Sequence, residues 1–246
     1  MSTTTLQGLQ PTVSFDGKEH APPPTELVES YEHILRSGQF PWTVHHRLIK
    51  MLGRGGQGVV YLSERRGADG FTLPVALKIF SPEHFEHVRD YDAAMARIAR
   101  VSARVAQIQQ DNLMGVQDFY DRHHIRMMVM DLIDGYDLRN LLSNRRLAQL
   151  ADRVSESRWE HINKVILTRG EVQPRIKPGV AVAIVRDCLA ALAALHREGV
   201  VHGDIKPGNV MLKHTGTTKI IDIGSAFEID DPPPHRSCTP RYAAPE

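Results

Sequence analysis

The sequence predicts an α+β fold with two lobes, the first rich in strands and the second led by a helix. Three observations support this prediction. Short β-branched, apolar runs follow one another between residues 48 and 131, and one helical period interrupts them. After residue 178 a long and strongly apolar helical pattern begins. Runs bounded by turn residues are typical of strands, whereas apolar residues three or four positions apart indicate a helix.

The composition is that of a globular protein. Of the 246 residues, 41% are hydrophobic and 24% are charged, which is enough apolar material for a core. The 30 Lys and Arg residues nearly balance 29 Asp and Glu, so the net charge predicts no general attraction to nucleic acid or acidic membranes. Cys188 and Cys238 are too few for a disulfide scaffold and fit a reducing compartment. We expect a cytoplasmic protein with no signal peptide and no membrane segment.

Residues 1–43 are predicted to form a flexible leader. The segment is rich in Thr, Gly and Pro, with three consecutive prolines at Pro22–Pro24, and it is expected to bury little surface. A docking peptide is the alternative interpretation. Folding is expected to begin with Trp42 and the apolar residues of 48–52, so the first lobe and its connection to the second are assigned to residues 44–133.

The first lobe is expected to contain a sheet and one helix. Residues 57–62 and 73–80 are apolar runs on either side of a polar, glycine-containing turn, which predicts a hairpin. Residues 125–130 predict a further, buried strand. Residues 91–110 follow a helical period. The apolar face of that helix would be formed by Met95, Ile98, Val101, Val105 and Ile108.

The second lobe is assigned to residues 134–246. Residues 180–195 predict a strong helix, and short strands are expected near 210–212 and 219–223. The buried stripe of the helix is predicted to consist of Val185, Leu189, Leu192 and Leu195.

Residues 145–177 interrupt this pattern and are predicted to be a partly helical insertion. They contain eight Lys or Arg residues against four acids. A solvated surface segment is the simpler interpretation, because charge runs usually form solvated faces. A dedicated docking patch for an anionic partner is the alternative.

The run from Gly53 to Val60 carries the first signal of chemistry. Its glycines have the spacing G-x-G-x-x-G-x-V, and a strand follows them instead of a helix. Glycines in a loop between two strands let backbone amides approach phosphate oxygens closely. Taken alone, the motif would also suit an ordinary hairpin turn.

Lys78 stands inside the apolar strand that follows the glycine run. Lysine is seldom buried without a partner, so its position needs an explanation. The phosphates of a nucleotide would supply that partner. The alternative is that the side chain extends to the edge of the sheet and places its charge in water.

The run from His202 to Asn209 supplies groups that phosphoryl transfer needs. Asp204 offers a carboxylate for the attacking hydroxyl, Lys206 a cation for the moving phosphoryl group, and Asn209 an oxygen ligand for Mg²⁺. Asp222 follows an apolar run and supplies a second carboxylate at a strand end, where it can hold metal.

In this order the motifs resemble those of eukaryotic-type protein kinases, and most of all the serine/threonine kinases found in bacteria. The resemblance covers about residues 44–246, and the run from Cys238 to Glu246 resembles the segment that closes the activation loop. It implies the bilobal protein-kinase fold, with a C-lobe that is incomplete at Glu246. The pattern Asp-x-Lys-Pro-x-Asn, which differs from the tyrosine-kinase versions, implies serine and threonine substrates.

The resemblance implies an enzyme that uses ATP and Mg²⁺ and transfers the γ-phosphoryl group to hydroxyls of protein substrates. Protein substrates and a regulatory protein are therefore the expected partners, and nucleic acid is not. The nucleotide-binding set implied by the family is Gly53, Gly55, Gly58, Val60, Ala76, Lys78, the gatekeeper Met130, the hinge residues Asp131, Leu132 and Ile133, and Asp137 near the ribose. The catalytic set is Asp204, Lys206 and Lys78, and the Mg²⁺ ligands are Asn209 and Asp222.

One departure from the family concerns Lys78. The predicted helix lacks the glutamate that pairs with this lysine in the family, and the expected position falls near Val101. Asp92 would be a substitute if the helix were shifted. An unpaired lysine would be poorly oriented, which would make activity weak or dependent on a partner.

A second departure lies in the catalytic loop. Gly203 replaces the arginine that pairs with a phosphorylated activation loop in the family. We therefore expect that phosphorylation of Ser225, Ser237 or Thr239 is not the main switch for activity.

Two other functions stay open at this point. A pseudokinase, which would bind nucleotide or act as a scaffold, is favoured by the missing helix glutamate. A small-molecule phosphotransferase is suggested by the His-Gly-Asp pattern, which also resembles kinases of aminoglycosides or choline. The glycine-rich loop and the run that ends at Glu246 favour a protein kinase over the second alternative.

Overall fold

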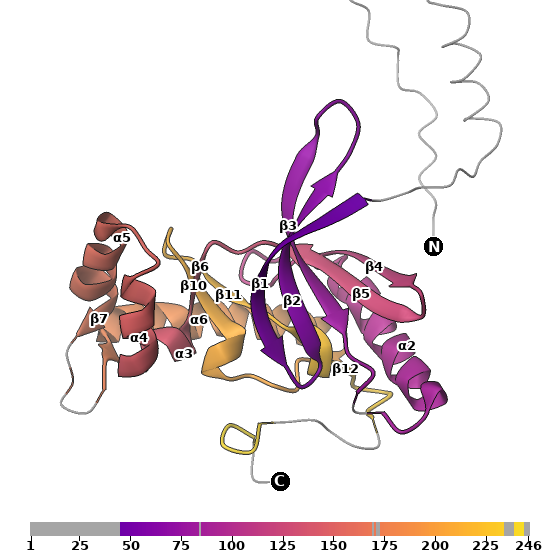
Figure 1. Ribbon diagram of the computed structural model, residues 1–246. Helices are drawn as coiled ribbons and strands as arrows, with labels where there is room; N and C mark the ends of the chain where they lie inside the picture. The colour runs from indigo at the N-terminus through magenta and orange to yellow at the C-terminus, as the bar shows by residue number, and fades with distance from the viewer. Residues whose placement is uncertain (1–44, 84, 169, 171–172, 234–238, 244–246) are drawn as a thin grey trace, which may run out of the picture. The chain divides into compact units, whose positions relative to one another are not determined.

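The computed structural model describes residues 45–83, 85–168, 170, 173–233 and 239–243. The predicted leader lies outside these residues, as do Ser237, Cys238 and Glu246. The described part has the two lobes that the sequence predicts, a sheet with one helix followed by a mainly helical lobe (Figure 1).

A five-stranded antiparallel sheet forms the first lobe, in the order β1-β2-β3-β5-β4. The predicted hairpin is confirmed as β2 and β3, and its register places Val60 opposite Lys78. The predicted strand at 125–130 is confirmed as β5. The strands are β1 (His45–Gly55), β2 (Gly58–Arg66), β3 (Thr72–Phe80), β4 (Val116–Arg122) and β5 (Ile125–Asp131).

Strand β3 is buried on both faces, and its alternation decides where its lysine points. Val75 and Leu77 belong to a small apolar cluster on one face of the sheet. Ala76 and Phe80 belong to the large core cluster on the other face. Because side chains alternate along a strand, Lys78 shares the face of Ala76 and Phe80.

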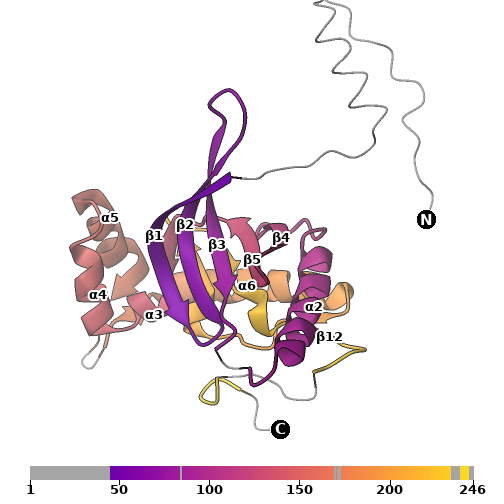
Figure 2. The same cartoon turned by 45° about the vertical axis from the view of Figure 1, so that its right-hand side comes forward.

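Helix α2 (Val88–Val105) supplies the covering for that face, and Figure 2 shows it beside the sheet. The helix is confirmed, but it begins earlier and ends earlier than the predicted 91–110. Met95, Val101 and Val105 are buried as predicted. Ile108 follows the end of the helix and packs against the same core from the next turn.

The second lobe contains short helices, small sheets and one long helix. A three-stranded sheet has the order β11-β10-β6, and β9 pairs with β12. In chain order, the elements of the second lobe are β6 (Gly135–Asp137), α3 (Leu138–Leu141), α4 (Asn144–Ala151), α5 (Glu156–His161), the π-helical turn η1 (Ile162–Ile166), β7 (Leu167–Thr168), β8 (Arg175–Ile176), α6 (Pro178–Arg197), β9 (Val200–Val201), the 3₁₀ turn η2 (Pro207–Asn209), β10 (Val210–Lys213), β11 (Thr218–Ile220), the 3₁₀ turn η3 (Ile223–Ser225) and β12 (Phe227–Glu228).

The long helix α6 is confirmed, but its predicted buried stripe is wrong in part. Val185 and Leu189 are 57% and 61% exposed, whereas Leu195 is buried. The buried apolar side chains are Ile184, Ala191, Ala194 and Leu195. The helix is apolar on most of its circumference, so periodicity alone does not distinguish the face that packs against the sheet strands from the opposite face.

Helix α6 is also long and apolar enough to cross a membrane by length and composition. One side of the helix packs into the core of the protein. Asp187 is buried on it, and this carboxylate accepts a hydrogen bond from the Thr218 backbone N–H at 3.1 Å. Ala191 and Leu195 are fully buried in the large core cluster.

The segment 145–177 is partly helical, as predicted, and it lies at the end of the molecule away from α2 (Figure 1). Ile162, Ile166 and Leu167 are buried in a second core cluster together with Leu141. The described charged side chains of this segment are exposed or half-buried, as a solvated surface predicts, whereas its buried apolar side chains help to form the core of the second lobe. Helix α4, in contrast, has no buried residue.

Strand β11 is shorter than the predicted 219–223. After Ile220 the chain leaves the ladder, and the backbone N–H of Ile221 donates to the carbonyl of Asn209 instead. Asp222 then adopts a left-handed conformation with a φ of 63°. This early end of the strand turns the Asp222 carboxylate toward Lys78.

Candidate active site

A cavity of about 950 Å³ lies between the glycine loop, β3, the hinge after β5, helix α2 and the loop before β10. Its lining includes every nucleotide-binding, catalytic and metal-binding residue that the resemblance implies. The fold thus brings together residues that are up to about 170 positions apart in the sequence. Their individual roles remain predictions at this stage.

The glycine loop is the tight connection between β1 and β2, where Gly55 pairs with Gly58. Gly58 has a φ of 135°, and a Cβ at this position would lie 2.0 Å from the carbonyl oxygen of Ile79. Only glycine fits there. A Cβ at Gly53 or Gly55 would meet no atom within 4 Å, so the protein's own packing does not require glycine at these two positions.

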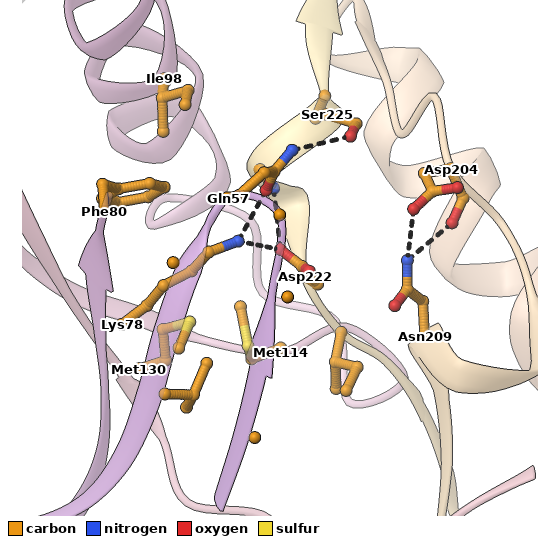
Figure 3. Close-up of a pocket in the computed structure, with 18 of the residues that line it drawn as sticks. Gln57, Lys78, Phe80, Ile98, Met114, Met130, Asp204, Asn209, Asp222 and Ser225 are labelled. Carbon is orange, nitrogen blue, oxygen red and sulfur yellow. Dashed lines mark hydrogen bonds and ion pairs between the residues drawn. The ribbon is translucent and has the colours of Figure 1, made fainter. Parts of the chain in front are cut away.

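Lys78 is 4% exposed and its ammonium group is paired. Nζ donates to Asp222 Oδ1 at 2.5 Å and to Gln57 Oε1 at 2.8 Å, as Figure 3 shows. Nζ also lies 5.2 Å from the centroid of the Phe80 ring. Extension of the side chain into water, the alternative considered from the sequence, is excluded by this burial.

Asp92 does not take the place of the missing helix glutamate. Its carboxylate lies 2.8 Å from Arg126 and 3.2 Å from His124. The residues of α2 that line the cavity carry no carboxylate; they are Ala94, Met95, Arg97, Ile98, Arg100 and Val101. The hypothesis that Asp92 pairs with Lys78 is therefore wrong, because the helix is not shifted far enough to bring its first turn to the lysine.

Asp222 occupies a strained backbone position next to this lysine. Its carboxylate also accepts a hydrogen bond from the Gly224 N–H at 3.2 Å. Burial by itself would raise the pKa of Asp222, but the charge and the hydrogen bond of Lys78 outweigh it and hold the pKa below its ordinary value. The carboxylate is therefore ionised at neutral pH.

The catalytic loop gathers three polar groups around Asp204. Lys206 Nζ donates to Asp204 Oδ2 at 2.5 Å, and the Asn209 amide donates to the same oxygen at 3.0 Å. The Thr239 hydroxyl donates to Asp204 Oδ1 at 2.8 Å and accepts from Lys206 Nζ at 2.9 Å. An alcohol is thus held between a carboxylate and an ammonium group.

The oxygen groups of Asn209 and Asp222 fit a magnesium ion. Asn209 uses its amide nitrogen for both of its bonds to Asp204, which leaves the amide oxygen as an acceptor. Mg²⁺ prefers oxygen ligands and commonly takes one or two from the protein and the rest from phosphates and water. In the described ranges no group of three His, Cys, Asp or Glu side chains forms a metal site without such help.

His202 and Gly203 fix the backbone before Asp204. The buried His202 ring donates from Nε2 to the Ile221 carbonyl at 3.1 Å and accepts the Asp204 N–H on Nδ1 at 3.3 Å. Burial lowers the pKa of His202, so the ring is neutral. Gly203 has a φ of 78°, and a Cβ there would lie 2.5 Å from the Ser225 carbonyl oxygen. An arginine would not fit this backbone, which accounts for the second departure from the family.

The hinge residues line the cavity, but their acidic side chains serve local structure. Asp131 accepts hydrogen bonds from the Gly115 N–H at 3.2 Å and from the Gln117 amide at 3.0 Å. Asp137 caps helix α3 by accepting the Asn140 N–H at 2.8 Å. Burial raises the pKa of Asp137 above its ordinary value. Any hinge contact of Asp131 with a ligand would therefore involve its backbone.

Gln57 is a residue that reasoning from the sequence missed. It occupies one of the unspecified positions of the glycine motif, and no spacing rule assigns it a role. In the structure its carboxamide reaches Lys78 and, at 3.1 Å, the Ser225 hydroxyl. Its identity as a long polar side chain in a loop of glycines was the only available signal.

A comparison with models of protein families matches residues 46–246 to the protein kinase domain. The chain belongs to the protein kinase family. The probable serine/threonine-protein kinase PknB of Lactococcus lactis is 28% identical over 76% of this chain and 24% of its own length. The serine/threonine-protein kinase PkaB of Streptomyces coelicolor is 31% identical over 80% of this chain and 41% of its own length.

This kinase domain therefore spans about a quarter to two fifths of the length of those relatives. The family match covers both lobes of the described fold and includes the catalytic loop and the glycine loop. It agrees with a cavity in which a glycine-rich loop, a paired lysine and a carboxylate next to an alcohol lie together.

Proposed function

We propose that this kinase domain transfers the γ-phosphoryl group of ATP to serine and threonine hydroxyls of protein substrates in the presence of Mg²⁺. The observation that carries the proposal is the position of the Thr239 hydroxyl between Asp204 and Lys206. The same two groups would meet the hydroxyl of a substrate. The names of the two relatives, both serine/threonine-protein kinases, support the choice of acceptor.

The chemistry assigned to the chain's own residues follows from these contacts. The Asp204 carboxylate accepts the hydrogen bond of the acceptor hydroxyl and orients its oxygen toward the phosphoryl group. The Lys206 ammonium offsets negative charge as it develops on the transferred group. Mg²⁺, held by Asp222 and Asn209, would neutralise phosphate charge and orient the phosphates.

The nucleotide is proposed to bind across the cavity from the hinge to the glycine loop. Apolar side chains of Val60, Ala76 and Met130 line the part near the hinge, which suits the adenine ring. Lys78 and the open backbone at Gly53 and Gly55 lie at the part suited to phosphates. A volume of about 950 Å³ falls within the usual range for small-molecule sites.

A regulatory protein is proposed as a partner, since α2 lacks the glutamate that pairs with the lysine in the family and carries Val101 near that position. The reaction is placed in the cytoplasm, where ATP is supplied and where an unpaired thiol such as Cys188 stays reduced.

The test measures transfer of labelled γ-phosphate from Mg-ATP to a generic protein substrate, together with ATP binding by calorimetry. Asp204→Asn keeps the size of the side chain and removes its charge. It should lower the rate by about 10²–10⁴-fold with little change in ATP affinity. A folded chain that binds ATP and transfers nothing would instead favour the nucleotide-binding scaffold. Transfer to aminoglycosides without transfer to protein would favour the small-molecule phosphotransferase.

A further inference from the structure

The partners of Lys78 come from the glycine loop and from the end of β11, and helix α2 contributes none of them. Asp222 is one partner, and it is also a proposed ligand of Mg²⁺. Once that carboxylate binds a cation, its hold on the lysine weakens. Gln57 is then the partner that remains free to hold the ammonium group.

The Gln57 carboxamide is itself held at both ends. Its oxygen accepts from Lys78 Nζ at 2.8 Å, and its nitrogen donates to the Ser225 hydroxyl at 3.1 Å. A lysine ammonium only donates hydrogen bonds, so the amide oxygen must face Lys78. The orientation of the carboxamide therefore follows from its partners. Figure 3 shows this chain of contacts from Ser225 through Gln57 to Lys78.

The space for the carboxamide exists because residue 224 is a glycine. A Cβ at Gly224 would lie 2.0 Å from Gln57 Oε1 and 2.7 Å from Lys78 Nζ. Any side chain there would displace the contact. On the helix side, the cavity is lined by apolar side chains and by Arg97 and Arg100, which only donate hydrogen bonds, so α2 offers no acceptor to the lysine.

We propose that Gln57 is the positioning residue for Lys78, in place of the carboxylate that helix α2 lacks, and that Ser225 holds the carboxamide in its orientation. This inference rests on the proposed function, because it assigns Lys78 to the phosphates of a nucleotide. A neutral carboxamide aims the ammonium group without cancelling its charge. The full positive charge then remains for the phosphates.

This arrangement links the orientation of Lys78 to the glycine loop. Gln57 lies within that loop, so the lysine is correctly aimed only when the loop is closed over Gly224. A kinase with a helix carboxylate would aim its lysine by moving the helix. Here movement of the β1–β2 connection would do so.

The experiment compares substitutions that keep or remove the amide. Gln57→Met preserves length and volume but removes both hydrogen bonds, whereas Gln57→Glu preserves an acceptor for Lys78. Gln57→Met should lower kcat by about 10- to 100-fold, the value of a hydrogen bond to a charged group, with a smaller rise in KM for ATP. Gln57→Glu keeps an acceptor but offsets the charge of Lys78, so it should lower kcat less than Gln57→Met does, and Ser225→Ala should also lower it less.

Gln107→Met serves as the matched control, because Gln107 is exposed just after α2 and its side-chain amide donates to the Ala103 carbonyl at 3.2 Å, away from Lys78. It should leave kcat and KM unchanged. An unchanged kcat in Gln57→Met would show that the carboxamide does not position Lys78, and a lower KM for ATP would show that it competes with the nucleotide. Either result would overturn the inference.

A second measurement separates this inference from the proposed function. The reagent is an acyl phosphate of ATP, which transfers its acyl group to a lysine amine beside the phosphates and releases ATP. The rate at which Lys78 is acylated therefore reports the position of its amine, and no phosphoryl transfer is needed. Lys78 of the unmodified chain should be labelled, and Gln57→Met should slow labelling about tenfold at equal nucleotide occupancy. Equal labelling rates would overturn the inference alone. Failure of the unmodified chain to bind ATP would overturn the proposed function, and the inference with it.

Discussion

The catalytic loop and the surroundings of Lys78 serve the same cavity but are assembled differently. Asp204 and Asn209 are five positions apart and bond to each other directly. Lys78 meets Gln57 and Asp222, which are 21 and 144 positions away. Short-range geometry is encoded in the spacing of a motif, so the first site could be predicted from the sequence. The second site depends on how three separate segments meet after folding.

Because the geometry of the catalytic loop is set by neighbouring residues, a substitution within this loop should destabilise the protein. Gly203→Arg, which would restore the residue usual in the family, places a side chain at a φ of 78° and against the Ser225 carbonyl oxygen. We expect the free energy of unfolding to fall by about 1–3 kcal/mol. Urea unfolding followed by circular dichroism measures the change. Gly216→Arg is the control for φ alone, since Gly216 has a φ of 92° and open space around it.

A loss of stability no larger than that of the control would show that the contact with Ser225 is not restrictive. The local geometry of the catalytic loop would then not depend on glycine at this position.

A pH effect of intermediate size is expected from His202. Burial lowers the pKa of this ring in the folded protein, so below about pH 6.5 the unfolded chain binds the proton more readily than the folded one. Stability should therefore fall as the pH falls from 6.5, by at most about 1.4 kcal/mol per pH unit from this group. Unfolding curves at several pH values measure the slope.

His202→Gln should flatten that slope between pH 6.5 and 5, because glutamine does not titrate. The exposed His214 provides the control, and His214→Gln should leave the part of the slope due to His202 unchanged. A slope that is the same in the protein with and without His202 would contradict a neutral, buried ring.

The smallest effect is expected at the outer end of α2. Arg104 lies 2.9 Å from the Glu228 carboxylate of β12, and its guanidinium also donates to the Glu198 carbonyl. Arg104→Ala should lower the free energy of unfolding by about 0.2–1 kcal/mol, because the arginine is half exposed to solvent. Arg89→Ala, on an exposed arginine in the first turn of α2, is the control.

The double variant Arg104→Glu with Glu228→Arg sharpens this test. Restored stability in the double variant, after a loss in each single one, would show that the charge pair holds the helix. Losses that simply add would mean that α2 is held by its apolar face alone.

Helix α6 shows why some packing could not be predicted. Its sequence is apolar on most sides, so more than one face of the helix carries apolar residues at the helical spacing of three or four positions. The structure buries the face with Ile184 and Ala191 and leaves Val185 and Leu189 exposed. Strand β3 is the opposite case, since the sequence predicts Lys78 inside an apolar strand, and the structure confirms the strand and the burial of the lysine.

The partner of Lys78 was not predictable for a related reason. The resemblance to the family directs the search for a carboxylate to α2, and Asp92 was the candidate there. The observed acceptors are Asp222, which follows β11, and the uncharged Gln57 of the glycine loop. The reach of Gln57 to the lysine depends on the open space above Gly224, which no local pattern describes.

The sequence by itself determined the two-lobed α+β order, the β2–β3 hairpin and the groups of the catalytic loop. These depend on periodicity, turn residues and short spacings, which are local properties of the chain. The tertiary structure alone decided which face of α6 is buried, that residues 162–167 complete a core, and that Lys78 is held by Gln57 and Asp222. Such contacts join distant segments, and their geometry is set by how all the elements pack together.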